Sequence, residues 1–185
     1  MRANLMRSPS GKATLLPQVA SSQILNPSEV VPGRSPAFAV EWQRVDGDKA
    51  ELSADLYERV GRAWGWVDRI NWTNAEWAGW ANRETLHLFV VRVDGEICGY
   101  VELDQQGPNV EVAFFGLLAD FIGKEIGGWL LGQGLREAWL LPGVERVWVH
   151  TCDLDAPTAL SNYQARGFVI TDTAIEWRLP LLPEC

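Results

Sequence analysis

The apolar residues of the chain fall mainly into short runs of the kind that form β-strands. Such runs, bounded by polar, glycine or proline residues, occupy residues 38–45, 86–93, 96–103, 110–118 and 144–152. Asp94-Gly95 separates the second run from the third, and this dipeptide between two apolar runs predicts a tight hairpin. Residues 104–109 predict a loop. Near the end of the chain, a turn at residues 171–173 is expected between two short strands at residues 168–170 and 174–179.

Two stretches in the first half of the chain predict helices. Ser53 can cap the first, and Leu56 and Val60 are spaced to lie on one face of it. Thr73 or Asn74 can cap the second.

Two more helices are expected in the second half. One covers residues 129–141, and the other follows Asp153 and Asp155, which can cap it, and ends before Gly167. A strand, a helix and a further strand in this order supply one parallel pair, so the sequence predicts a mixed α/β sheet.

Length and composition predict one folded domain. The chain has 185 residues, and residues 1–35 are rich in serine and proline without a sustained period, so we expect an irregular N-terminal arm ahead of a single domain at residues 36–185. The formal net charge of −8 argues against nucleic acid as a partner. No run of about eighteen apolar residues exists, so no membrane span is expected.

The three cysteines, Cys98, Cys152 and Cys185, are odd in number and lack metal-binding spacing. Cys98 and Cys152 both lie in apolar runs, which predicts reduced core residues in a cytoplasmic protein, with a catalytic cysteine as the alternative. Neither histidine has metal partners at useful spacing, so no metal is expected. His150, near the end of its strand, is interpreted as a strand-end histidine rather than a catalyst.

The segment after the strand at residues 110–118 carries the strongest functional signal. Residues 119–128 include three glycines and lead into the helix at residues 129–141. A glycine-rich turn between a strand and a helix places several backbone N–H groups at the positive end of the helix. This arrangement predicts a site for phosphate or pyrophosphate.

Three local strings in this part of the chain match known motifs. Ile122-Gly123-Lys124-Glu125-Ile126-Gly127 is similar to an acetyl-CoA loop of the form Arg/Gln-x-x-Gly-x-Gly/Ala, from which Ile122 and Glu125 depart. Residues 162–168 are similar to a helix ending in Leu-Tyr-x-x-x-Gly-Phe, with Asn162 in place of leucine, and residues 111–117 resemble a strand that carries a catalytic glutamate. Together with the order of elements, these strings resemble the GCN5-related N-acetyltransferase (GNAT) family.

The resemblance implies a fold and an activity. The fold is a mixed, mostly antiparallel sheet of six to seven strands, with a central parallel pair that splays apart, and about four helices. The activity is transfer of an acetyl group from acetyl-CoA to a primary amine of a small molecule or protein. The residues implied to bind acetyl-CoA are Leu117, Leu118, Ala119, Gly123, Lys124, Glu125, Ile126, Gly127, Gly128 and Asn162.

Glu111 and Tyr163 are the candidate catalytic residues. An alkylamine is protonated near pH 7, so a base is useful, and Glu111 is the implied general base. A backbone N–H near Leu117 would stabilise the negative charge on the attacked carbonyl, and Tyr163 would protonate the departing thiolate as general acid. The alternatives are a solvent-facing carboxylate for Glu111 and a packing tyrosine for Tyr163.

Half of the ten tryptophans lie between residues 64 and 80. Trp64, Trp66, Trp72 and Arg69 predict an acceptor pocket with an aromatic wall, which could stack on a cation. The alternative is that these rings pack in the core. The acceptor is expected to be a small-molecule or peptide amine.

Three questions stay open from the sequence. A catalytically silent CoA-binding or regulatory module is one alternative, favoured by Ile122 and Glu125. A transferase that uses a different, longer acyl-CoA is another. A homodimer, formed through edge strands or the N-terminal arm, is neither favoured nor excluded.

Overall fold

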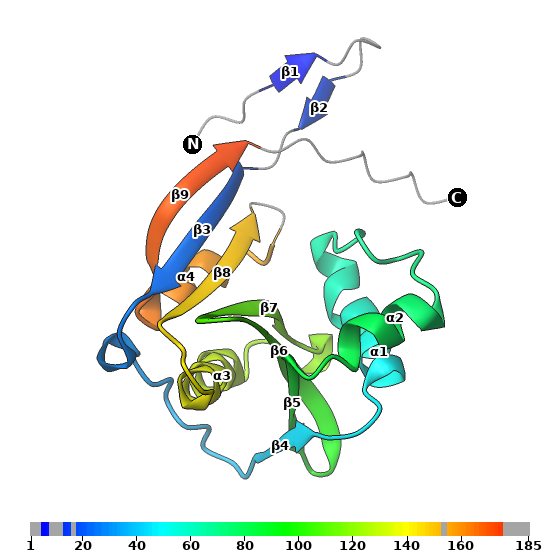
Figure 1. Ribbon diagram of the computed structural model, residues 1–185, viewed down its shortest axis with the longest axis vertical. Coiled ribbons are helices and arrows are strands. Elements are labelled where there is room, and N and C mark those ends of the chain that lie inside the picture. Colours follow the sequence, from blue (N-terminus) through cyan, green and yellow to red (C-terminus); the bar gives the residue numbers. More distant parts are fainter. Residues whose placement is uncertain (1–4, 8–12, 16–17, 153–154, 176–185) are drawn as a thin grey trace.

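The computed structural model of the protein describes residues 5–7, 13–15, 18–152 and 155–175 (Figure 1). The strands are β1 Leu5–Arg7, β2 Ala13–Leu15, β3 Gln18–Ile24, β4 Glu41–Val45, β5 Leu86–Val93, β6 Glu96–Gln106, β7 Asn109–Leu117, β8 Arg146–Cys152 and β9 Val169–Ile175. The α-helices are α1 Ala50–Gly61, α2 Asn74–Ala81, α3 Ile126–Leu140 and α4 Ala159–Ala165. Short 3₁₀ turns lie at η1 Pro27–Glu29, η2 Arg62–Trp64 and η3 Ala119–Phe121.

Seven strands form one mixed sheet in the order β4-β5-β6-β7-β8-β3-β9. Every neighbouring pair is antiparallel except β7 and β8, which are parallel. β1 and β2 form a separate antiparallel pair. The predicted mixed, mostly antiparallel sheet with one parallel pair is confirmed, as are four α-helices within the described residues.

Helices cover both faces of the sheet (Figure 1). On one face, Leu56 of α1 packs in a buried cluster with Leu88 of β5. On the other face, Leu131 of α3 and Tyr163 of α4 pack in the largest buried cluster, together with Val101 of β6. The sheet is therefore the middle layer of three.

Two local predictions about turns and caps are confirmed. Asp94 and Gly95 form a two-residue turn with φ of +50° and +83°, and Val93 pairs with Glu96 across it. Thr73 caps α2, because its side chain accepts a hydrogen bond from the backbone N–H of Glu76 at 3.3 Å.

The segment at residues 1–35, predicted to be irregular, contains a strand of the main sheet. β3 lies between β8 and β9 and pairs with both, with Ser21 opposite His150 on one side and Asp172 on the other. The prediction is wrong for Gln18–Ile24 because the run of small and polar residues in β3 gives little apolar signal, while its two neighbours supply the pairing. The division of the chain at residue 35 stays a prediction.

Several boundaries differ from the prediction. α3 begins at Ile126 rather than at residue 129, so Gly127 and Gly128 lie in its first turn rather than in the predicted loop, and β4 begins at Glu41 rather than at residue 38. Ser53 lies inside α1 rather than at its start, and its hydroxyl hydrogen-bonds to Glu102. β6 and β7 extend into the segment predicted to be a loop at residues 104–109. No turn interrupts residues 171–173, because β9 is continuous there and Thr171 forms a bulge against β3. Residues 176–179 of the last predicted strand lie outside the described residues.

The chain between β3 and β4 crosses α3 and the end of α4 at very short range. A Cβ atom on Gly33 would lie 2.1 Å from the carbonyl oxygen of Gly128, and one on Gly167 would lie 2.1 Å from that of Glu29. The backbone N–H of Val31 donates to the carbonyl of Arg166 at 3.1 Å. Only glycine fits these two positions, and Gly167 also has a φ of +103°, which agrees with the predicted helix end.

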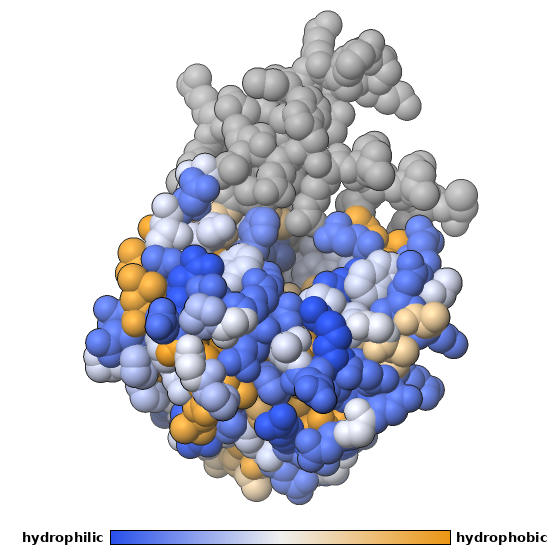
Figure 2. All heavy atoms as spheres, in the orientation of Figure 1, coloured by the Kyte–Doolittle hydropathy of each residue, from blue (hydrophilic) through white to orange (hydrophobic). Residues whose placement is uncertain are grey.

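The face of the molecule in Figure 2 is mostly hydrophilic, with scattered hydrophobic residues. None of the helices in the described residues combines the length and apolar character needed to cross a bilayer.

Candidate active site

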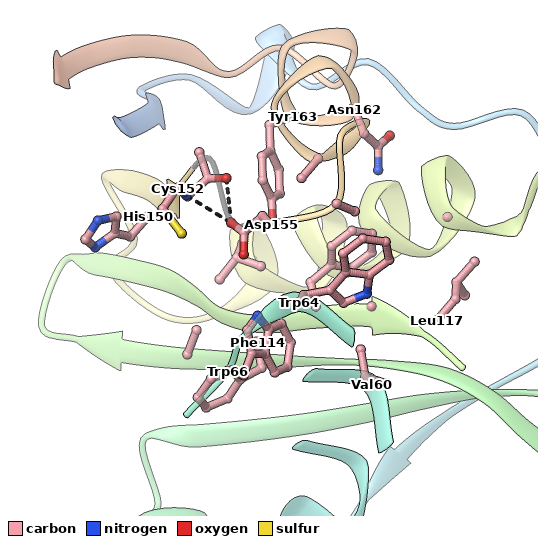
Figure 3. A pocket seen from close by; sticks show the side chains of 18 of the residues that line it. Val60, Trp64, Trp66, Phe114, Leu117, His150, Cys152, Asp155, Asn162 and Tyr163 are labelled. Carbon is pink, nitrogen blue, oxygen red and sulfur yellow. Dashed lines mark hydrogen bonds between the residues drawn. The ribbon is translucent and has the colours of Figure 1, made fainter. Parts of the chain in front are cut away.

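The parallel pair β7–β8 separates soon after it begins. Pairing covers Asn109 to Glu111 on β7, with Glu111 opposite Trp148, whereas β7 continues to Leu117 and β8 to Cys152. The splayed pair implied by the GNAT resemblance is thus present. Beyond this point, the two strands and the elements beside them line a pocket of about 590 Å³ (Figure 3).

The inner edge of β7 presents backbone groups to this pocket. Opposite residues in an antiparallel ladder alternate between hydrogen-bonded and non-hydrogen-bonded pairs. The N–H of Leu118 donates to the carbonyl of Cys98 at 2.9 Å, so this is a hydrogen-bonded pair. Leu117, opposite Gly99, and Phe115, opposite Val101, therefore belong to non-hydrogen-bonded pairs. The amides of Leu117 and Phe115 therefore face away from β6, toward the gap. Leu118 was predicted to bind the donor, but its N–H is already used within the sheet.

The start of α3 lies beside the same pocket. Gly127 lines the pocket, and the first helical turn leaves N–H groups without intrahelical acceptors. Just before the helix, Gly123 has a φ of +82° and Glu125 a φ of +59°. Glu125 occupies the position where the acetyl-CoA loop motif has its first glycine, and the left-handed backbone explains why glycine suits that position.

The predicted donor-binding residues divide into three groups. Leu117, Gly127 and Asn162 line the pocket. Leu118 and Ile126 are buried in the core. The remaining positions form the loop surface and the first turn of α3 next to the pocket; these are Ala119, Gly123, Lys124, Glu125 and Gly128.

Two arginines that were not predicted lie near this helix start. Arg34 Nη1 is 3.7 Å from Glu125 Oε2, and both side chains are exposed. Arg166 Nη1 donates to the carbonyl of Gly128 at 3.4 Å. Lys124, one of the residues implied to bind acetyl-CoA, has its Nζ 4.6 Å from the ring centroid of Phe121. The motif at residues 162–168 contains Arg166, but its consensus assigns that position no role.

Glu111 shares a hydrogen-bond donor with a second carboxylate. Gln106 Nε2 donates to Glu111 Oε2 at 3.0 Å and to Asp104 Oδ2 at 3.1 Å, and Asp104 and Glu111 face each other across β6 and β7. The buried Asp104 also pairs with Arg83 at 3.2 Å. Burial, and to a lesser extent the nearby charge of Asp104, raises the pKa of Glu111. Glu111 is half-buried and lines the pocket.

Tyr163 enters the pocket from α4. It is 6% exposed, and its ring packs on Phe168 and Phe115 with centroids 5.7 and 6.2 Å away. Burial, with a smaller contribution from Asp155, raises the pKa of the Tyr163 hydroxyl, so it keeps its proton at neutral pH.

Asp155 has a different role from the predicted helix cap. Its Oδ2 accepts hydrogen bonds from Thr151 Oγ1 at 2.7 Å and from the backbone N–H of Cys152 at 3.0 Å (Figure 3). α4 begins later, after Thr158, without a side-chain cap. Asp155 therefore closes the turn after β8 at the pocket wall. Asp153 lies outside the described residues.

The predicted acceptor residues separate into two places. Trp64, Trp66 and Arg69 line the pocket, whereas Trp72 lines a separate groove on α2 with Trp80. The two places meet at Arg69, whose Cζ lies 3.6 Å from the Trp80 ring centroid and 4.3 Å from that of Trp72. The guanidinium group of Arg69 therefore stacks on the rings of Trp72 and Trp80.

Several pocket residues were missed from the sequence. Tyr57, Val60 and Phe114 line the pocket, and Ala113 forms a bulge opposite the Glu102–Leu103 step of β6. The apolar spacing of α1 had identified Val60 only as a core position. Extending the two strands through the expected loop would have placed Asp104 opposite Glu111.

His150 also lines the pocket, with an exposed side chain. Cys98 is fully buried, as predicted, but the prediction of a core residue is wrong for Cys152, which is half-buried and lines the pocket because β8 ends there; Cys185 lies outside the described residues. Within the described residues, no group of three His, Cys, Asp or Glu side chains is arranged to hold a metal ion.

Comparison with known proteins agrees with this geometry. The model of the acetyltransferase (GNAT) family matches residues 51–168, well over half of the chain. The chain belongs to this family. No protein with a curated description matches it.

Solved structures share the fold at low identity. A GCN5-related N-acetyltransferase from Kribbella flavida is 18% identical, with a TM-score of 0.62 over 85% of this chain and 56% of that one. An aminoglycoside acetyltransferase from an uncultured soil metagenomic sample, in complex with sisomicin, is 14% identical, with a TM-score of 0.56 over 77% and 97%. AAC(6′)-Iy in complex with the bisubstrate analogue CoA-S-monomethyl-acetylneamine is 17% identical, with a TM-score of 0.55 over 77% and 99%.

The chain spans between 38% and 59% of the length of four solved structures that it matches, among them the Kribbella flavida protein. At such identities the likeness describes the fold alone.

The left-handed backbone at Glu125 predicts a difference between two substitutions. Glu125→Gly and Glu125→Ala both remove the carboxylate, but only glycine adopts this backbone without strain. We expect the glycine variant to have a free energy of unfolding about 1 kcal/mol larger than the alanine variant. Urea denaturation of both proteins measures this difference. Equal stabilities would mean that residue 125 does not hold the left-handed conformation.

Proposed function

We propose that this GNAT chain transfers an acetyl group from acetyl-CoA to a primary amine of a small molecule or protein. The observation that carries the proposal is the pocket between the separated ends of β7 and β8, bounded by the start of α3. A strand edge with outward amides suits an extended amide-containing chain such as pantetheine. A helix start with unused N–H groups suits a diphosphate.

The two departures from the loop motif are compatible with this donor. The Glu125 side chain is 74% exposed and extends toward solvent, whereas Ile122, although 54% exposed, lines the pocket as an apolar residue. The contacts to the diphosphate would come from backbone N–H groups, which any residue except proline has. Lys124, Arg34 and Arg166 would add positive charge around the helix start.

The proposed chemistry uses three groups of the pocket. Glu111 accepts a proton from the amine, directly or through a water, and the amine nitrogen attacks the thioester carbonyl. The N–H of Leu117 donates to the carbonyl oxygen as negative charge develops there. The C–S bond then breaks, and the Tyr163 hydroxyl donates to the departing sulfur. The products are the amide and CoA. The ammonium nitrogen loses two protons in all: one goes to Glu111, and the other replaces, directly or through solvent, the proton that Tyr163 gave to the sulfur.

A catalytically silent CoA-binding module is the second candidate. The carboxylate of Glu125 at the start of α3 favours it, because a negative charge there opposes a diphosphate. The pocket size leaves a transferase with a longer acyl-CoA as a further alternative. Each of the three predicts a different result with acyl-CoA and amines.

The test mixes the purified protein with acetyl-CoA and a panel of primary amines and measures release of free thiol. We expect thiol release that depends on the amine, and calorimetry should detect binding of CoA. Binding of CoA without thiol release would support the silent module. Faster release from a longer acyl-CoA would support that alternative. An absence of heat with CoA at millimolar concentration would contradict the donor assignment.

Glu111→Gln and Tyr163→Phe test the catalytic roles. Each variant should lower kcat by about 10²- to 10⁴-fold, because each removes a proton acceptor or donor from the reacting groups. Glu145→Gln, an exposed carboxylate before β8, is the matched control and should keep full activity. If both pocket variants retain the kcat of the parent protein, the assignment is wrong.

The pH profile of kcat/KM tests the surroundings of Glu111. Because the base must be deprotonated, kcat/KM should fall at acid pH. The raised pKa of Glu111 places the midpoint of this fall above about 4.3, the ordinary pKa of a glutamate side chain. Asp104→Asn removes a neighbouring negative charge and should move this midpoint to lower pH. Gln106→Leu removes a hydrogen bond to the carboxylate and should move it to higher pH. His150 and Arg69 also lower the pKa of Glu111, and they are unchanged in both variants. Shifts in the same direction would exclude Glu111 as the titrating base.

A further inference from the structure

The aromatic wall of the pocket carries information about the acceptor. We infer that the amine acceptor has a flat apolar or aromatic body, bound against Trp64 and Trp66, rather than a polyhydroxylated or polycationic one. This inference rests on the proposed acetyltransferase activity and specifies its substrate class. Figure 3 shows Trp64, Trp66 and Phe114 below Tyr163 and Asn162, with the pocket between them.

Part of this wall is a group of aromatic rings that pack on one another. Trp66 packs on Tyr57 and Phe114 with ring centroids 5.5 and 5.2 Å away, and Tyr57 packs edge-on to Phe114 at 5.1 Å. Gly61 makes room for Trp66, because a Cβ atom there would lie 2.4 Å from the indole. Rings fixed in this way hold a ligand at low entropic cost.

Trp64 differs from the other rings of this segment. Its indole lines the pocket and is half-buried, but no aromatic ring or cation stacks on it within the described part of the chain. It follows α1 in the η2 turn and precedes Gly65, whose φ is +68°. An indole that faces a pocket without a ring partner is suited to stack on a planar ligand.

The charged groups of the pocket suit one ammonium group rather than several. A buried cation needs a carboxylate partner. Glu111 has one oxygen bound to Gln106, and Asp155 already accepts two hydrogen bonds through Oδ2. Asp68 is exposed, and Arg69 places a positive charge in the same wall. Of the three carboxylates that line the pocket, two are thus already engaged in hydrogen bonds, and Arg69 would repel a second ammonium group.

The test compares kcat/KM for matched amines with acetyl-CoA as donor. The panel contains tryptamine, 2-phenylethylamine, the non-aromatic 2-cyclohexylethylamine, spermidine and sisomicin. We expect tryptamine and 2-phenylethylamine to exceed spermidine and sisomicin by at least about tenfold. Equal or higher values for spermidine or sisomicin would overturn the inference while leaving the acetyltransferase activity in place.

A variant series separates stacking from folding. Trp64→Ala should raise the KM for tryptamine by about tenfold, and Trp64→Phe should restore most of the loss, because a ring is retained. Trp139→Phe, an indole of α3 outside the pocket, is the control and should leave KM unchanged. An unchanged KM in Trp64→Ala would overturn the inference.

A binding measurement distinguishes this inference from the proposed function. Calorimetric titration of tryptamine into the parent protein and into Trp64→Ala needs no turnover. If no amine releases thiol, the proposed activity fails, and binding of tryptamine that weakens in Trp64→Ala would still support the aromatic site. Absence of tryptamine binding to the parent protein, with and without CoA, would overturn it.

Discussion

The early separation of β7 from β8 is the constraint on which the pocket depends. Each strand is held on its outer side, β7 by β6 from Asn109 to Leu117 and β8 by β3 from Val147 to Cys152, while their shared edge pairs only as far as Glu111. Backbone groups on the free edges still require hydrogen-bond partners. Water or an extended ligand must supply them. The sheet therefore creates a binding edge in its middle, where an ordinary sheet would have none, and the strand that anchors β8 comes from the N-terminal segment.

Beside that edge, directional bonds fix the helices to the sheet. Glu102 is fully buried in β6, and it accepts hydrogen bonds from Ser53 of α1 at 2.5 Å and from Trp80 of α2 at 2.8 Å. Burial raises its pKa, and both donors oppose that effect. Asp104, two residues further along β6, forms an ion pair with Arg83. Glu111 lies opposite Asp104 on β7 and lines the pocket. Because buried polar groups are costly without partners, these bonds set the position of α1 and α2 relative to β6, with which β7 pairs. Trp64 and Trp66 of the aromatic wall lie in the segment that joins α1 to α2, so the placement of these two helices also determines where the wall lies.

Local signals in the sequence predicted much of this structure, and contacts between distant segments account for what was missed. The Asp94-Gly95 turn, the Thr73 cap and the helix end at Gly167 each depend on a few adjacent residues, and each is confirmed. β3 could not be predicted in this way, because its pairing partners lie more than 120 residues away and its own residues are mostly small or polar. The side-chain partners of Ser53 and Asp155 decide their roles, and a cap motif read along the chain does not include those partners. The pocket could be located from the loop motif. The residues that shape Glu111 and the aromatic wall required the strand register.

The N-terminal segment contacts both β8 and the start of α3, which bound the pocket. β3 pairs with β8 on the side away from β7, and the chain that follows it places Gly33 against Gly128 and brings Arg34 near Glu125. The ion pair itself contributes little because both side chains are exposed. The backbone contact is different, since no side chain fits between Gly33 and the first turn of α3. The segment that pairs with β8 therefore also fixes the position of that turn relative to the sheet. In this protein, the departures at Ile122 and Glu125 leave the backbone N–H groups in place, and the segment around Gly33 holds the helix start that presents them.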